Sequence, residues 1–155
     1  MRRLWMGYWL AVAFLIAVHP AVGWAFDSDV TCPADVTSGA EITAFLRLEN
    51  DECTQAEVRL ISSIVGNADQ TLGGIGIQGP TVVESAITVP AGIDNFPPGC
   101  FDVTPGIFQD IVTISPAVPI SLEGTVATLI VITEWRIGGQ KETTEVIQCL
   151  VNVQP

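Results

Sequence analysis

From Val30 onward, apolar and polar residues alternate along the chain with a period of two. The apolar face of residues 41–49 consists of Ile42, Ala44, Leu46 and Leu48, and residues 55–60 repeat the same alternation. Successive side chains of a β-strand point to opposite faces of a sheet, so this period predicts strands with one buried face. We find no helical stripe after the N-terminal segment, so the pattern favours an all-β fold.

The last third of the chain predicts a long hairpin. Residues 125–135 are almost continuously apolar and rich in β-branched residues, which is typical of a central strand. Gly138 and Gly139 then form a hairpin-turn signal, and residues 142–153 form the returning strand. A shorter strand is predicted over residues 110–114. With turn residues spread between the strands, these elements predict a single antiparallel β-sandwich of seven to eight strands.

Two stretches carry a resemblance to a known group of domains. Cys32-Pro33, followed by residues 37–42 with Gly39 and by residues 46–50, resembles the opening of bacterial immunoglobulin-like surface domains. Residues 122–126 and the final hairpin look like the last two strands of the same sandwich. The resemblance implies an immunoglobulin-like fold and a surface location, and it implies no particular ligand.

The N-terminal segment is typical of a secretory signal. Arg2 and Arg3 precede the apolar stretch Leu4–Val18, and small residues then offer cleavage points after Gly23 or after Ala25. The apolar stretch is short for a full membrane span of about 20 residues. We therefore expect a signal peptide over residues 1–25 and one domain over residues 26–155, secreted or at the periplasmic or cell-surface side of the membrane.

Composition narrows the chemistry once the signal is set aside. The only His, the only Tyr, both Met and three of the four Trp fall before residue 26. Residues 26–155 hold four basic residues against 17 acidic ones, a formal net charge of −13. This charge excludes nucleic acid and disfavours anionic membrane surfaces as partners. The absence of His and Met excludes a blue-copper centre.

Residues 26–155 also lack the side chains that most enzymes use in catalysis. A nucleophilic Ser would need a neighbouring base, and only Lys141 is available, directly after the predicted hairpin turn. Carboxylate pairs leave a small hydrolase as an alternative, although most acids fall at predicted turns or on polar strand faces. We therefore expect no enzyme, no catalytic residues and no cofactor.

Calcium is the one metal that the acidic turns suggest. The candidate ligands are Asn50, Asp51 and Glu52, with further oxygen ligands at Asp27 and Asp29 and at Asn67 and Asp69. No spacing matches a known calcium loop. The alternative is that Asn and Asp occupy these positions because they form turns.

The glycine-rich stretch 72–80 superficially resembles a phosphate-binding loop. It contains no Lys, and no helical pattern follows it. We interpret it as a wide loop or a bulged edge strand, with Ile75 and Ile77 as candidate partner-binding residues.

Four cysteines in an exported chain predict two disulfides. Their wide spacing is unlike that of a zinc site. Cys32 and Cys149 fall in predicted strands, while Cys53 and Cys100 fall in predicted loops. In an immunoglobulin-like sandwich the first and last strands run parallel as neighbours, so the resemblance favours Cys32–Cys149 with Cys53–Cys100. The pairing Cys32–Cys53 with Cys100–Cys149 stays open.

The leading hypothesis is an exported, non-catalytic module with a structural or interaction role. Its partner would be another protein, a glycan or itself. Phe45 and Ile61 fall on polar strand faces and are candidate contact residues, the alternative being a wider core. A second hypothesis is a strand-exchanging subunit of an extracellular fibre that donates residues 26–36.

Overall fold

The computed structural model describes residues 25–66 and 78–155. The expected signal peptide, apart from Ala25, lies outside the described residues, as do Asn67, Asp69, Ile75 and Ile77. Within the described ranges, no helix has the length and apolar character needed to cross a membrane.

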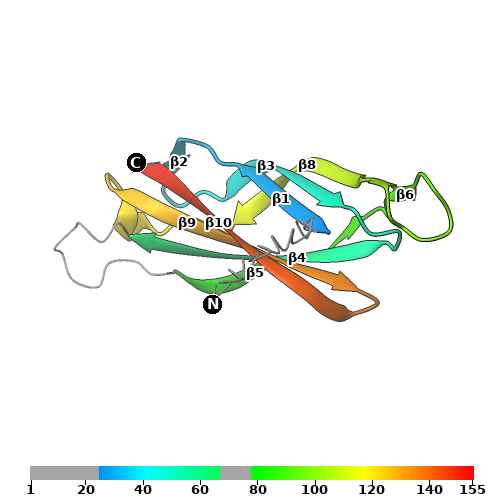
Figure 1. The fold of residues 1–155 in the computed structure, drawn as a ribbon. Helices are drawn as coiled ribbons and strands as arrows, with labels where there is room; N and C mark the ends of the chain where they lie inside the picture. Colours follow the sequence, from blue (N-terminus) through cyan, green and yellow to red (C-terminus); the bar gives the residue numbers. More distant parts are fainter. Residues whose placement is uncertain (1–24, 67–77) are drawn as a thin grey trace, which may run out of the picture.

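Two β-sheets pack face to face (Figure 1). The smaller sheet contains β1 (Phe26–Thr31), β3 (Ile42–Asn50) and β8 (Gly106–Ser115), in the order β1-β3-β8. The larger sheet contains β2 (Asp35–Thr37), β10 (Gln140–Gln154), β9 (Val126–Ile137), β4 (Ala56–Gly66) and β5 (Gln78–Val89), in the order β2-β10-β9-β4-β5. A short hairpin of β6 (Ile93–Asp94) and β7 (Val103–Thr104) and one 3-10 turn (Ile120–Leu122) complete the described elements. The predicted all-β, immunoglobulin-like sandwich is confirmed, with eight strands in its two sheets.

The chain changes sheets between β1 and β2. β1 pairs antiparallel with β3 in the smaller sheet, whereas β2 pairs parallel with β10 in the larger one. Cys32 lies in this crossing, so it follows β1 instead of lying within a strand as the pattern suggested. A disulfide joins it to Cys149 of β10, with 6.2 Å between the two Cα atoms. This bridge covalently links the point of sheet exchange to the last strand.

The core contains the alternating residues of both sheets, with Trp135 as its largest side chain. Trp135 is fully buried and stacks on Phe26 at a ring-centroid distance of 4.7 Å. Its indole N–H donates to the hydroxyl of Ser28 at 3.0 Å, and this hydroxyl lies 2.9 Å from that of Thr133. The polar atoms of the tryptophan and of Thr133 are therefore satisfied across the two layers, as buried polar groups require.

The predicted hairpin forms as expected. β9 lies between β10 and β4, so the apolar stretch occupies a central position in the larger sheet. Gly138 and Gly139 connect β9 to β10 with φ values of +55° and +82°. Two successive positive φ angles are the requirement of the tight turn that matches the twist of paired strands, and glycine meets this requirement without steric cost.

Strand β5 was not specified by the alternation. It begins at Gln78 at the end of the glycine-rich stretch, and it forms the edge of the larger sheet with three register shifts against β4. Each shift interrupts the period of two, which hides the strand from a pattern search. The described part of this stretch therefore agrees with the bulged edge strand that the sequence allowed.

Candidate functional site

Residues 90–105, which we call the aromatic loop, connect β5 to β8 and contain the β6–β7 hairpin. The loop projects from the end of the sandwich opposite the C-terminus (Figure 1). Three large apolar side chains in it are exposed: Ile93 at 68%, Phe96 at 71% and Phe101 at 89%. Aromatic side chains this exposed lose the burial that stabilises them elsewhere, so their position needs an explanation.

A disulfide attaches the loop to the body of the sandwich. Cys100 is bonded to Cys53, which lies in the turn between β3 and β4, and the two Cα atoms are 5.9 Å apart. The backbone N–H of Cys53 also contacts the sulfur of Cys100 at 3.0 Å. The segment between Phe96 and Phe101 is therefore connected covalently to the turn between β3 and β4.

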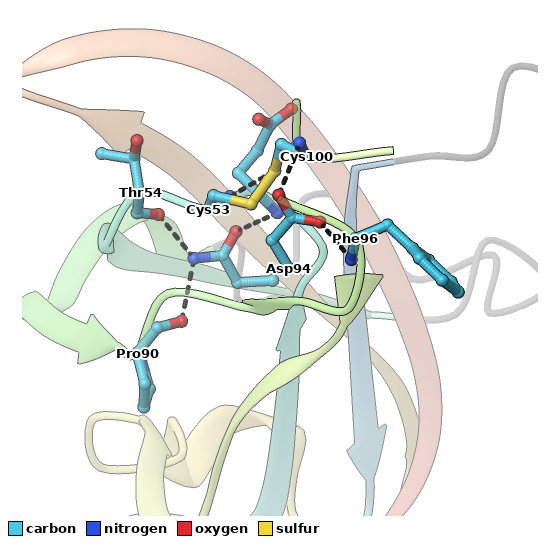
Figure 2. Close-up of a disulfide and its surroundings, with 8 residues drawn as sticks. Cys53, Thr54, Pro90, Asp94, Phe96 and Cys100 are labelled. Atoms are coloured by element: carbon cyan, nitrogen blue, oxygen red, sulfur yellow. Dashed lines mark hydrogen bonds between the residues drawn. A yellow bond between two sulfur atoms is a disulfide. The ribbon is translucent and has the colours of Figure 1, made fainter. Parts of the chain in front are cut away.

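Asp94 organises the tip of the loop (Figure 2). One oxygen of its carboxylate accepts a hydrogen bond from the backbone N–H of Phe96, and the other accepts one from the N–H of Cys100, both at 3.0 Å. Such side-chain caps are the usual reason for an aspartate in a turn. Figure 2 shows the Phe96 ring pointing away from the disulfide and from Asp94. The carboxylate thus holds the backbone while the ring stays outside.

Hydrogen bonds from the side chain of Asn50 hold the base of the aromatic loop. It is fully buried at the end of β3, and its amide N–H groups donate to the carbonyls of Thr54 and Pro90, both at 2.9 Å. Its amide oxygen accepts from the backbone N–H of Glu52 at 2.9 Å. A single side chain therefore connects the Cys53 turn with the first residue of the aromatic loop.

Glycine is required where the loop returns to the sheet. A Cβ atom on Gly106 would overlap the carbonyl of Pro90, and one on Gly92 would overlap the Val103 side chain. The two ends of the loop therefore approach each other more closely than any side chain would allow. This approach keeps the two ends of the loop close together.

The surroundings of the loop are acidic. Residues 90–105 contain Asp94 and Asp102 and no basic residue, and the neighbouring turn adds Asp51 and Glu52. The Cys53–Cys100 bridge brings these two segments together. The site is therefore an apolar tip with an acidic border, held in shape by one disulfide and by hydrogen bonds to Asn50 and Asp94.

The calcium candidates serve this loop in another way. Asn50 uses its amide oxygen and both of its N–H donors on backbone groups, as described above. In the described ranges, no group of three His, Cys, Asp or Glu side chains comes close enough to hold a metal ion. The hydrogen bonds of Asn50 show its turn-forming role, and calcium binding by Asn50, Asp51 and Glu52 stays a prediction.

The two predicted contact residues lie on opposite faces of the molecule. Phe45 is 41% exposed on the outer face of the smaller sheet, opposite Ile111 in the strand register. Ile61 is half-buried on the outer face of the larger sheet. They cannot belong to one contact surface, and neither belongs to the aromatic loop.

The strand pattern of the sequence does not single out Ile93, Phe96 and Phe101. The available signal was the combination of two Phe with Pro97, Pro98 and Gly99 near a cysteine. Proline and glycine mark a turn, so aromatic residues among them are placed at the surface more readily than those in a strand. The alternation of strands cannot reveal such residues because the loop has no period.

Comparisons with known proteins were made with both sequence and structure. No protein-family model and no curated protein sequence matches the chain. A PapD-like domain of human CEP192 is similar in structure, with a TM-score of 0.47 and 14% identity over 84% of each chain. The sporulation control protein Spo0M of Bacillus subtilis is similar with a TM-score of 0.41 and 13% identity, over 85% of this chain and 50% of that protein.

A DUF4466 family protein from Parabacteroides merdae gives a TM-score of 0.39 with 11% identity, over 81% of this chain and 43% of that one. The chain thus spans half the length of Spo0M and less of the DUF4466 protein. No family membership or activity follows from similarity at this level. The fold assignment rests on the strand pairing of this chain itself.

Proposed function

We propose that the chain is an exported, non-catalytic β-sandwich module that binds another protein through its aromatic loop. The observation that supports this proposal most is the exposure of Phe96 and Phe101 on a backbone held by the Cys53–Cys100 disulfide. Binding normally costs the entropy of ordering a loop, and a loop already held in shape avoids much of this cost. Aromatic side chains, phenylalanine among them, are enriched at the centre of protein–protein interfaces.

The chemistry of the loop defines its partner. Two phenylalanines and one isoleucine fit an apolar pocket, and the carboxylates of Asp51, Glu52 and Asp102 favour a pocket bordered by Arg or Lys. An anionic lipid surface would be repelled by the same carboxylates. We therefore favour a protein with a basic rim around an apolar pocket, and we treat membrane insertion as an outcome to be tested.

Export from the cytoplasm is consistent with the proposed binding function. Two disulfides indicate an oxidising environment, outside the cytoplasm. The N-terminal sequence has the pattern of a secretory signal, which such export would need. A module secreted into the periplasm, to the cell surface or to the medium would meet its partner there.

The two alternatives draw less support. A fibre subunit would release residues 26–36, but β1 pairs with β3 of its own chain, β2 pairs with β10, and Cys32 is bonded to Cys149. A hydrolase would gather three or more acids in one hollow. The open groove of about 490 Å³ between β5 and β8 is lined by only two, Glu41 and Glu84.

The proposal is tested by capturing binding partners with the exported full chain under non-reducing conditions. The test variant is Phe96→Ala with Phe101→Ala, and the matched control is Ile111→Ala with Ile120→Ala, two residues exposed at 70% and 71% elsewhere. We expect the test variant to lose a partner that wild type and control both retain. Equal capture by all three proteins would contradict the proposal.

A second arm separates a protein partner from a lipid one. The chain is mixed with vesicles of neutral phosphatidylcholine and with vesicles containing an anionic lipid. We expect no co-sedimentation with either. Co-sedimentation that depends on Phe96 and Phe101 would replace the protein partner with a membrane.

A further inference from the structure

The outer face of the larger sheet is more apolar than a solvated face requires. On the inner face of β9, the side chains of Ala127, Leu129 and Val131 are fully buried in the core of the sandwich. The alternate residues Ile130 and Ile132 point to the opposite side, where no described element covers them, and they are only half-buried. A strand that is apolar on both faces is typical of a sheet covered on both sides. A two-layer sandwich covers one side only.

The strand register aligns these residues into a band. Ile132 of β9 lies opposite Val146 of β10 on one side and opposite Ile61 of β4 on the other, and Ile61 lies opposite Val82 of β5. Val146 is 57% exposed and Val82 is 40% exposed. Four neighbouring strands thus carry one continuous apolar row. With the adjacent Ile130 and the 67% exposed Leu150, it forms what we call the outer apolar face.

This face is also where the positive charge of residues 26–155 gathers. Three of its four basic residues, Arg59, Arg136 and Lys141, form ion pairs with Glu134 at 3.5, 3.4 and 3.6 Å. Glu134 lies next in line from Ile132 on the same face of β9. The fourth, Arg47, pairs with Glu49 on the smaller sheet. Glu57, which is exposed opposite Arg136 in the register, adds a second carboxylate. The outer apolar face is therefore bordered by nearly balanced charge, three basic residues against two acidic ones, while the rest of residues 26–155 is strongly acidic.

We infer that two copies of this chain pack their outer apolar faces against each other. A two-fold axis would bring the same band of each copy into contact, as symmetric dimers require. The four long strands of this sheet, β10, β9, β4 and β5, lie about 4.8 Å apart and run for about ten residues or more at 3.3 Å per residue, so together they cover about 600 Å². Two such faces would bury about 1,200 Å² in total, which is the lower end of the range for a stable interface of ordinary size.

The distribution of charge over the surface favours a second copy of this chain as the partner that covers the outer apolar face. Two acidic molecules repel each other across most of their surfaces, and only a face with nearly balanced charge lets them approach. The added layer would cover Ile130 and Ile132 in the way that the apolar sequence of β9 requires. None of the residues of the aromatic loop belongs to this face, so the inference is independent of the proposed function.

The test is sedimentation equilibrium of the exported full chain. Concentrations run from about 1 to about 100 µM, at about 0.15 M and about 0.5 M NaCl. We expect a dimer mass at the higher concentrations and tighter association at high salt, because screening reduces the repulsion between acidic copies while the apolar contact persists. A monomer mass at every concentration and salt level would overturn the inference.

Two variants with the same charge change locate the contact. Val146→Lys adds one positive charge to the outer apolar face, and Ile111→Lys adds one to the outer face of the smaller sheet, where Ile111 is 70% exposed. We expect Val146→Lys to weaken the dimer by at least about tenfold in Kd, and Ile111→Lys to leave it within about twofold, with the thermal unfolding of both variants showing that they fold. Equal weakening by both, or weakening by Ile111→Lys alone, would place the contact elsewhere and overturn the inference.

Discussion

The two disulfides of this chain are chemically alike and support different regions. Cys32–Cys149 lies where the chain changes sheets, and Cys149 is 9% exposed among core residues. Cys53–Cys100 lies between an exposed turn and the aromatic loop, outside the sheets. The first secures the arrangement of strands, and the second secures the position of side chains that contribute nothing to the core.

This difference separates stability from function. Both bridges close long loops, so both constrain the unfolded chain. Only the loss of Cys53–Cys100 would free Phe96 and Phe101 to sample many conformations. A measurement of stability alone therefore cannot distinguish the two bridges. The variants that lack each bridge have to be compared both in their free energy of unfolding and in their capture of a partner.

The largest expected effect is that of removing the bridge at the sheet crossing. Its cysteines are 117 residues apart, and we expect Cys32→Ala with Cys149→Ala to reduce the free energy of unfolding by about 5 kcal/mol in the chain-entropy model. Urea unfolding followed by the fluorescence of Trp135 measures this loss. At low temperature, where the variant stays folded, it should capture partners as the wild type does. A folded variant that captures nothing would break the distinction between the two bridges.

The loop bridge should give a slightly smaller loss of stability and a total loss of binding. Its cysteines are 47 residues apart, so Cys53→Ala with Cys100→Ala should cost about 4 kcal/mol in the same model. Hydrogen exchange should accelerate in residues 90–105 and stay slow in β9. If the amides of the loop remain as protected as in the wild type, then the disulfide does not hold its shape.

Asn50→Ala should reduce the free energy of unfolding by an intermediate amount, because its side chain contacts both the Cys53 turn and the start of the aromatic loop. The substitution leaves the N–H of Glu52 and the carbonyls of Thr54 and Pro90 without their partner, at a cost of about 1–3 kcal/mol. Thermal unfolding measures the cost, and Asn152→Ala, an exposed asparagine on β10, serves as the control. A change no larger than that of the control would show that Asn50 does not support the loop.

The smallest effect on stability should come from the aromatic residues themselves. Phe96→Ala with Phe101→Ala removes exposed side chains outside the core, so the free energy of unfolding should change by about 0.5 kcal/mol or less. Urea unfolding checks this. A loss of several kcal/mol would mean that the two rings are part of the packing and not of a contact surface.

Much of the sandwich could be predicted from the sequence because its information is local and periodic. The alternation in residues 41–49 and the Gly138-Gly139 turn each determine a local geometry, and β3 and the β9–β10 hairpin follow from them. The favoured cysteine pairing used the resemblance to an immunoglobulin-like sandwich, and the structure has the same pairs.

The aromatic loop could not be predicted because exposure is a property of the whole fold. A phenylalanine usually indicates core, and nothing local distinguishes Phe101 at 89% exposure from Phe26 at 6%. The difference arises from the disulfide between Cys53 and Cys100, which are 47 residues apart in the sequence, and from the buried amide of Asn50, which binds the carbonyl of Pro90 from 40 residues away. The sequence marks Asn50 as a calcium candidate for its oxygen, and in the structure its side chain makes three hydrogen bonds to backbone groups.

The proposed binding function requires that the aromatic loop is the contact surface. The most direct measurement places a photo-crosslinking residue at Phe101, at Phe45 on the smaller sheet, and at Phe101 in the chain that lacks the Cys53–Cys100 bridge. After irradiation of cells that express the chain, we predict one discrete crosslinked product from Phe101, none from Phe45, and a weak or absent product without the bridge. A product from Phe45 with none from Phe101 would contradict the proposed binding function.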